Sequence, residues 1–429
     1  MQITLYDMAM KPKILTTLQT YTRQQFVLDI IAGLTVAMVA LPLSIAIAIA
    51  SGADPSKGIV TAVVGGFLIS LFGGSKVQIG GPTGAFIVVV FGIIADHGYD
   101  GLVIATLMAG VILVLAGLLR TGNLIRYVPE AVVNGFTIGI AIIIAASQFR
   151  DVLGLQMTQI PADFIEKMQA LWAARDSLNM TSLAIALLAM MLIILFRRSA
   201  PRLPGLFIAM VIVSALAAVM KLPIDTIGSR FGELPHGLPI PSAPTISVAR
   251  AIELLPSALV IAFLAGVESL LSAMVADKMI GSYHRPNAEV LAQGFANIGS
   301  ALFGGLPATG AIARTATNVR AGGKTPVAGI VHALAILGVT MMIGRLVGFL
   351  AMPALAALLM VTAYNMSEPH KWREFLGAPN EDRLLLLLTL ILTIFADLTV
   401  AISVGTAVGL AIRLRKQDAA TDDWSVPDR

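Results

Sequence analysis

Long apolar stretches follow one another along almost the whole chain, and no other feature constrains the fold as strongly. A bilayer core is about 30 Å thick, so a crossing helix needs about 20 mainly apolar residues. Two of the stretches, 83–95 and 311–319, are too short to cross alone. We therefore predict an all-α polytopic membrane protein with 14 segments. They are 27–50, 56–73, 83–95, 101–119, 129–148, 179–196, 205–221, 254–276, 287–303, 311–319, 325–344, 347–366, 382–397 and 399–415.

The composition agrees with a membrane protein and excludes several other classes. Hydrophobic residues make up 57% of the chain and charged residues 13%, with a mean hydropathy of +0.87, whereas a soluble domain carries roughly 25% charged residues. The absence of Cys excludes thiol catalysis and Cys-ligated metals. The net charge of +4 is too small and dispersed to indicate nucleic acid. Since no catalytic or phosphate-binding motif is present, we predict neither an enzyme nor a bound cofactor.

Lys and Arg residues set the expected orientation in the membrane. If the N-terminus is cytoplasmic, 20 of the 29 lie inside and eight outside, and Arg314 remains within the membrane. We therefore predict a multi-pass protein of the bacterial inner membrane with both termini in the cytoplasm and no cleaved signal peptide. The polar stretches 149–178 and 222–250 are predicted as outside surface loops with little influence on the chemistry, and 417–429 as a cytoplasmic tail.

An internal repeat connects the two short segments. LFGG occurs at 71–74 and again at 302–305, and each copy is followed by a related motif, PTGA at 82–85 and PATGA at 307–311. The copies lead into the third and tenth segments, so the repeat unit has seven segments. Because an odd number of crossings reverses direction, the two halves form a 7+7 inverted repeat. Inverted repeats with interrupted helices are typical of secondary transporters.

The interrupted helices predict an anion site near the middle of the membrane. Gly and Pro residues before Thr83 and Ala311 allow an extended backbone, which is tolerated at that depth where protein or water satisfies it. Each half-helix then presents unpaired N–H groups and the positive end of its dipole, which together bind anions. Hydroxyl groups of Thr83 and Thr309 can cap these helices or donate to a ligand. Alternatively, the Gly and Pro residues serve only close helix packing.

Two charges within predicted spans call for a partner or a role, since burying a charge in lipid is costly. Arg314 lies near the start of the second half-helix and could pair with an anion, or could be structural. Glu268 and Ser272 lie one helical turn apart on one face. Desolvation favours a protonated carboxyl group, so Glu268 is a candidate proton carrier. The same pair could bind Na⁺, or Arg314 could neutralise Glu268 permanently.

Several motifs, taken together, resemble the SulP anion transporters. They occur in the same order and with the same spacing over essentially all segments, and they most resemble bacterial members that carry C4-dicarboxylates with protons. The motifs are PLSIAIAIASG at 42–52, GPTGAF at 81–86, ESLLS at 268–272, TGAIARTATNVRAGGKTP at 309–326 and YNMSE at 364–368.

The resemblance implies a uracil-permease-like fold with two domains that move as an elevator. A core domain would comprise 1–125 and 251–345, and a gate domain 126–250 and 346–416. It implies a coupling-ion site at Glu268 and Ser272. Ala311 and Ala313 replace hydroxyl residues of some relatives, so backbone N–H groups and Arg314 would be the donors here. The implied substrate site comprises Leu43, Ile47, Thr83, Gly84, Ala311, Ile312, Ala313 and Arg314.

We therefore expect a proton-coupled importer of a small anion such as fumarate or succinate in the lipid bilayer. Na⁺-coupled bicarbonate transport, proton-coupled sulfate transport and a passive anion channel stay open as alternatives, and a membrane scaffold would leave Glu268 and Arg314 without a role. Members of this family usually continue into a cytoplasmic STAS domain, which we do not find before Arg429. A homodimer is compatible with the sequence.

Overall fold

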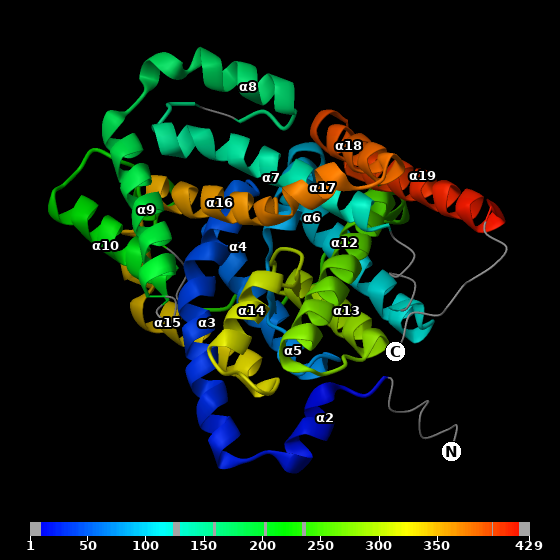
Figure 1. Ribbon diagram of the computed structural model, residues 1–429. Helices are drawn as coiled ribbons and strands as arrows, with labels where there is room; N and C mark the ends of the chain where they lie inside the picture. The colour runs from blue at the N-terminus through cyan, green and yellow to red at the C-terminus, as the bar shows by residue number, and fades with distance from the viewer. Residues whose placement is uncertain are drawn as a thin grey trace.

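The computed structural model describes residues 10–122, 129–157, 160–200, 204–233, 237–396 and 398–419 and is mainly helical (Figure 1). Its elements begin and end close to the predicted segments. In the first half they are α2 (Lys13–Thr17), η1 (Leu18–Thr20), α3 (Arg23–Ala50), α4 (Pro55–Val60), η2 (Thr61–Gly65), α5 (Gly66–Phe72), β1 (Gly80–Gly81), η3 (Gly84–Phe86), α6 (Ile87–Leu118), α7 (Glu130–Leu153), α8 (Phe164–Ala173), η5 (Arg175–Ser177), α9 (Met180–Ser199) and α10 (Gly205–Val219).

The second half also consists of long and short helices. Its elements are α11 (Ile227–Phe231), α12 (Val248–Ile280), α13 (Pro286–Leu302), β2 (Thr309–Gly310), α14 (Ile312–Arg320), α15 (Val327–Val347), α16 (Met352–Met366), η6 (Pro369–Lys371), α17 (Trp372–Gly377), α18 (Asn380–Phe395) and α19 (Leu398–Ala419). Among the described residues, six stretches, the longest being Gly84–Leu118, are long and apolar enough to span a membrane.

The predicted third and fourth segments run together as α6, which is interrupted at one residue. Gly98 has φ 73° and ψ 175°, well outside helical values, so the chain turns there between two helical parts. A residue with a Cβ is disfavoured at such a positive φ. The division between the segments predicted at 83–95 and 101–119 therefore corresponds to this glycine.

The long helices pack into a bundle in which sequence-distant elements meet. Helix α6 packs against α12 and α13, α3 against α15 and α14, and α7 against α16 and α18. In Figure 1 the short helices α2 and α8 lie at opposite ends of the bundle. We refer to the end that carries α8 as the α8 side.

The two predicted breaks meet inside the bundle as a short two-stranded sheet. Strands β1 and β2 are antiparallel, with Gly80 opposite Gly310 and Gly81 opposite Thr309. All four residues are buried. The N–H group of Ala311 also donates to the carbonyl oxygen of Ile79 at 2.8 Å. This pairing places the start of η3, which leads into α6, beside the start of α14.

We predict that Gly81→Ala disrupts this junction. Gly81 has φ +148°, and a Cβ there would lie 2.3 Å from Nη1 of Arg314, so Arg314 must move. The variant should lose about 1–3 kcal/mol of unfolding free energy and weaken anion binding at the site that the sequence predicts here. Thermal unfolding in detergent and transport assays would measure the two effects.

Gly338→Ala is the matched control, because a Cβ at Gly338 would meet nothing within 4 Å. It should lower neither stability nor anion affinity. Wild-type anion affinity in Gly81→Ala would show that the position of Arg314 does not depend on this close approach.

Candidate functional site

Both half-helices begin without a capping side chain. Thr83 precedes η3 and Ala311 precedes α14, and neither end receives a side-chain capping hydrogen bond. The first N–H groups of a helix have no partner within it, so both ends can donate to a ligand. Of the two roles predicted for the threonine hydroxyls, capping is not observed: Thr83 Oγ1 donates to Glu268 Oε2 at 2.8 Å, and Thr309 Oγ1 donates to the carbonyl oxygen of Ala265 at 2.9 Å.

Arg314 lies between the two breaks with part of its guanidinium group unsatisfied. Its side chain is buried at 2% exposure. Nη2 donates to Ser44 Oγ at 3.1 Å and to the carbonyl oxygen of Pro82 at 2.8 Å. Nε and Nη1 have no hydrogen-bond partner among the described residues. Because a buried donor without a partner costs free energy, these groups are positioned to bind an anion.

Glu268 and Ser272 lie on α12 but contact different neighbours. Glu268 is half-buried and accepts the hydrogen bond from Thr83. Ser272 is fully buried, and its Oγ donates to Thr315 Oγ1 at 3.3 Å. Thr315 Oγ1 in turn accepts from the N–H group of Ile79 in the first break. The Glu268 carboxyl group therefore contacts the residue before the first half-helix, Thr83. The Ser272 hydroxyl group contacts Thr315, which bonds the backbone just before β1.

The other predicted substrate residues surround the same junction with different exposures. On α3, Leu43 is half-buried and Ile47 is 2% exposed. Gly84 is buried, and a Cβ there would lie 2.9 Å from Sδ of Met366 in α16. Ala311 is buried, whereas the next two residues, Ile312 and Ala313, are exposed. The first turn of α14 therefore has an accessible apolar face next to its free N–H groups.

The sequence analysis missed a second buried acid, Glu289, which holds the first break in place. Its side chain has no exposure. Oε2 accepts from the N–H groups of Gly74 and Ser75 at 2.9 and 3.1 Å. Oε1 accepts from three side chains, namely Gln78 Nε2, Ser269 Oγ and Gln293 Nε2 at 3.0, 3.0 and 2.9 Å. Glu289 lies within the predicted segment 287–303. Because a charge within a span is costly unless it has partners, the sequence alone could have indicated its buried role.

Comparisons with known proteins agree with this architecture. The sequence profile described as "Sulfate permease family" matches residues 26–389.

The chain belongs to the sulfate permease (SulP) family.

This SulP chain is similar to two curated relatives and to one solved structure. It is 43% identical to YvdB of Bacillus subtilis, described as a candidate sulfate transporter, over 86% of this chain and 70% of the relative. It is 31% identical to the bicarbonate transporter BicA of Picosynechococcus over 77% of this chain and 60% of BicA. The transmembrane domain of a cyanobacterial BicA matches with a TM-score of 0.80 and 30% identity, over 89% of this chain and 98% of that domain. The chain therefore spans about 60–70% of the length of these two relatives.

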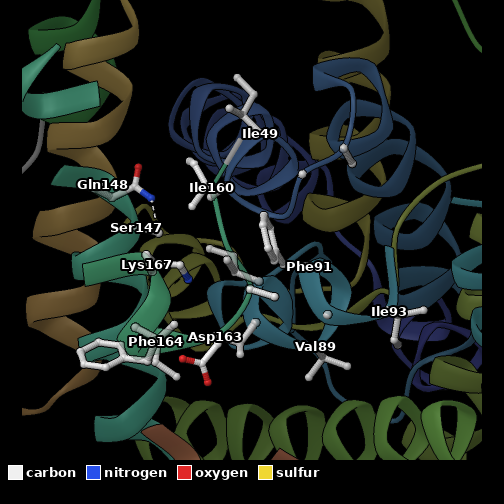
Figure 2. A pocket seen from close by; sticks show the side chains of 18 of the residues that line it. Ile49, Val89, Phe91, Ile93, Ser147, Gln148, Ile160, Asp163, Phe164 and Lys167 are labelled. Atoms are coloured by element: carbon white, nitrogen blue, oxygen red, sulfur yellow. Dashed lines mark hydrogen bonds between the residues drawn. The ribbon is translucent and has the colours of Figure 1, made fainter. Parts of the chain in front are cut away.

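A cavity of about 670 Å³ lies on the α8 side of this SulP protein. Figure 2 shows side chains that line it, among them Phe91 and Lys167. It is lined by residues of α3, α6, α7, α8, α11, α12 and α18 and reaches Ile87 and Val88 in the first turn of α6. None of the predicted site residues lines it. The stretch 149–178, predicted as a surface loop with little influence on the chemistry, contains α8, from which Lys167 reaches the cavity. Helix α8 is amphipathic and lies within a mixed polar stretch, so a search for long apolar runs does not detect it.

We predict that Glu289→Ala destabilises the protein strongly. The substitution removes the carboxylate that accepts from five donors. The N–H groups of Gly74 and Ser75 and the hydroxyl group of Ser269 lose this acceptor outright, whereas Gln78 and Gln293 still donate to Ser269 Oγ. A buried unsatisfied group costs about 1–3 kcal/mol, so the free energy of unfolding should fall by about 3 kcal/mol or more. Thermal and denaturant unfolding in detergent would measure the loss.

Glu374→Ala provides the comparison, because Glu374 is exposed on α17. Its effect should stay within about 0.5 kcal/mol. Equal stability of the two variants would mean that Glu289 does not hold the first break.

Proposed function

We propose that the protein is a secondary active transporter that carries a small anion together with a proton, with C4-dicarboxylates such as fumarate or succinate as substrates. One observation carries the proposal: a buried arginine, Arg314, keeps two donor groups unpaired between two uncapped half-helices. Dipole ends and a guanidinium group both favour a carboxylate or oxyanion. The substrate site then comprises these groups and the neighbouring residues Leu43, Ile47, Thr83, Gly84 and Ala311–Ala313.

Proton coupling follows from the contact between Glu268 and the first half-helix. Thr83 Oγ1 donates to the carboxyl group at 2.8 Å, so Glu268 lies beside the proposed anion site. A bound anion repels negative charge on Glu268, and protonation of the carboxyl group therefore accompanies anion binding. Ser272, one turn further along α12, completes the proposed coupling site.

We propose that the substrate crosses by an elevator movement of a core domain, 1–125 and 251–345, against a gate domain, 126–250 and 346–416. The close packing of Gly84 on Met366 joins the substrate site to the proposed gate. The cavity lined by α3 and α6 on one side and by α7, α8 and α18 on the other follows the proposed domain boundary. On the proposed topology, which keeps both termini in the cytoplasm of the bacterial inner membrane, the α8 side is outside.

A second candidate is transport of sulfate, or of bicarbonate coupled to Na⁺. It is favoured by the descriptions of the relatives, a candidate sulfate transporter and a bicarbonate transporter. The same donors suit all three anions, since each presents carboxylate or other oxyanion oxygens. Na⁺ would bind at Glu268 and Ser272 in place of the proton, because it prefers oxygen ligands.

Uptake by purified protein in proteoliposomes tests these proposals together. Radiolabelled fumarate, succinate, sulfate and bicarbonate are supplied with a proton gradient, with a Na⁺ gradient or with neither. We expect accumulation of a C4-dicarboxylate with the proton gradient alone. Accumulation of bicarbonate driven by Na⁺ would instead select the second candidate. Voltage-driven current without accumulation would contradict both and indicate a channel.

We predict that Glu268→Gln separates binding from coupling. Because Gln cannot take up a proton, a pH gradient should no longer concentrate the substrate, and the ratio of internal to external anion should fall to about one. Exchange of internal for external anion should continue. Glu253→Gln, on the same helix but exposed, should keep gradient-driven accumulation. Concentrative uptake by Glu268→Gln under a proton gradient would exclude Glu268 as the proton carrier.

A further inference from the structure

The cavity on the α8 side contains charged side chains that the proposed transport site does not use. The charged groups that are not already paired within the protein determine which ligand the cavity can bind. The charged lining residues are Asp54, Asp96, Arg150, Asp151, Asp163, Lys167 and Arg230.

Two of the four acids are occupied with helix ends. Asp54 Oδ1 accepts from the N–H group of Ser56 at 2.9 Å and caps α4. Asp163 Oδ1 accepts from the N–H groups of Ile165 and Glu166 at 2.8 and 3.1 Å and caps α8. Since these carboxylates already accept hydrogen bonds from backbone donors, they are poor partners for a further cation.

Asp151 and the two arginines are also largely engaged, whereas Asp96 is not. Asp151 pairs with Arg230 at 2.8 Å. Asp96 is exposed at the end of the cavity wall. Arg150 Nη2 donates to the carbonyl oxygen of Met157 at 2.9 Å, whereas its Nε has no partner among the described residues. Apart from these contacts, the cavity wall keeps an unpaired donor, Arg150 Nε, and the exposed carboxylate of Asp96, which has no partner among the described residues.

Lys167 is the lining cation that lacks an acceptor. Its side chain is 4% exposed, yet within the described part of the chain its ammonium group forms neither an ion pair nor a hydrogen bond. Nζ lies 5.5 Å from the ring centroid of Phe91 on α6, and Figure 2 shows it directed into the cavity. Burial lowers the pKa of Lys167, and the Asp163 carboxylate opposes part of that effect. A buried ammonium group has three donors that favour anionic oxygen.

We propose that this cavity is an outer anion-binding site, in which the Lys167 ammonium group holds the transported carboxylate or oxyanion before it reaches Arg314. Its volume of about 670 Å³ lies within the range of small-molecule sites. It also extends to Ile87 and Val88, directly after η3, so an anion released from Lys167 is next to the half-helix junction. The inference rests on the proposed anion transport and adds a second site to it.

Charge variants at Lys167 test the site through the concentration dependence of uptake. For anion supplied on the α8 side, Lys167→Gln should raise KM about tenfold with kcat nearly unchanged, and Lys167→Arg should stay within about twofold of wild type. A fall in kcat without a change in KM would overturn the proposal and leave Lys167 as a contact between α8 and α6. Absence of transport by the wild-type protein would contradict the proposed function itself, before any variant is compared.

The absence of Cys allows a direct test of occupancy. In the full-length Lys167→Cys variant, an aminoethyl thiosulfonate restores the positive charge and should lower KM, whereas a sulfonatoethyl reagent should raise it. Fumarate or sulfate, whichever the wild type transports, should slow the modification. Lys57→Cys is the control: Lys57 Nζ lies 5.2 Å from the ring centroid of Tyr99 but does not line the cavity. Equal effects at both positions, or modification at a rate independent of the anion, would refute the site.

Discussion

Backbone hydrogen bonding at the two helix breaks is the constraint on which the rest of the structure depends. An N–H or C=O group without a partner at membrane depth costs several kcal/mol, so each extended segment needs partners within the bundle. Buried polar side chains from neighbouring helices supply them. Glu289 bonds Gly74 N and Ser75 N, Asn318 bonds Val77 O, Thr315 bonds Ile79 N, Thr61 bonds Leu306 N, Ser300 bonds Leu306 O, and Asn297 bonds both N and O of Ala308.

This arrangement explains why Arg314 is both fixed and incompletely paired. Its Nη2 serves the same purpose as the polar side chains above, since it satisfies the carbonyl oxygen of Pro82. The bond orients the guanidinium group, and the small residue Gly81 allows its close approach. The remaining donors, Nε and Nη1, keep no hydrogen-bond partner among the described residues. A structural role and a role in anion binding are therefore compatible in one side chain, because they use different nitrogen atoms.

The sequence predicts most of the helix bounds and both breaks, because apolar run length and clustered Gly and Pro are local signals. It does not predict partners. The contact between Thr83 and Glu268 joins residues 185 positions apart, and no periodicity indicates it. Glu289 could be recognised as a charge within a span, but its acceptance of backbone donors depends on how α13 packs beside the first break. Helix α8 was missed because its apolar face is short and lies within a polar stretch.

The distribution of unpaired cations fits the needs of transport better than one strong site would. An anion bound by every donor of a desolvated guanidinium group would leave slowly, whereas movement through a protein requires binding that is favourable at entry yet weak enough for release. One nitrogen atom of Arg314 already donates to the backbone carbonyl oxygen of Pro82, which limits how strongly the proposed inner site can bind an anion. Lys167, a point charge on a flexible stem, imposes little geometry on a ligand. On the two proposals made above, two moderate sites in succession would pass an anion from Lys167 to Arg314.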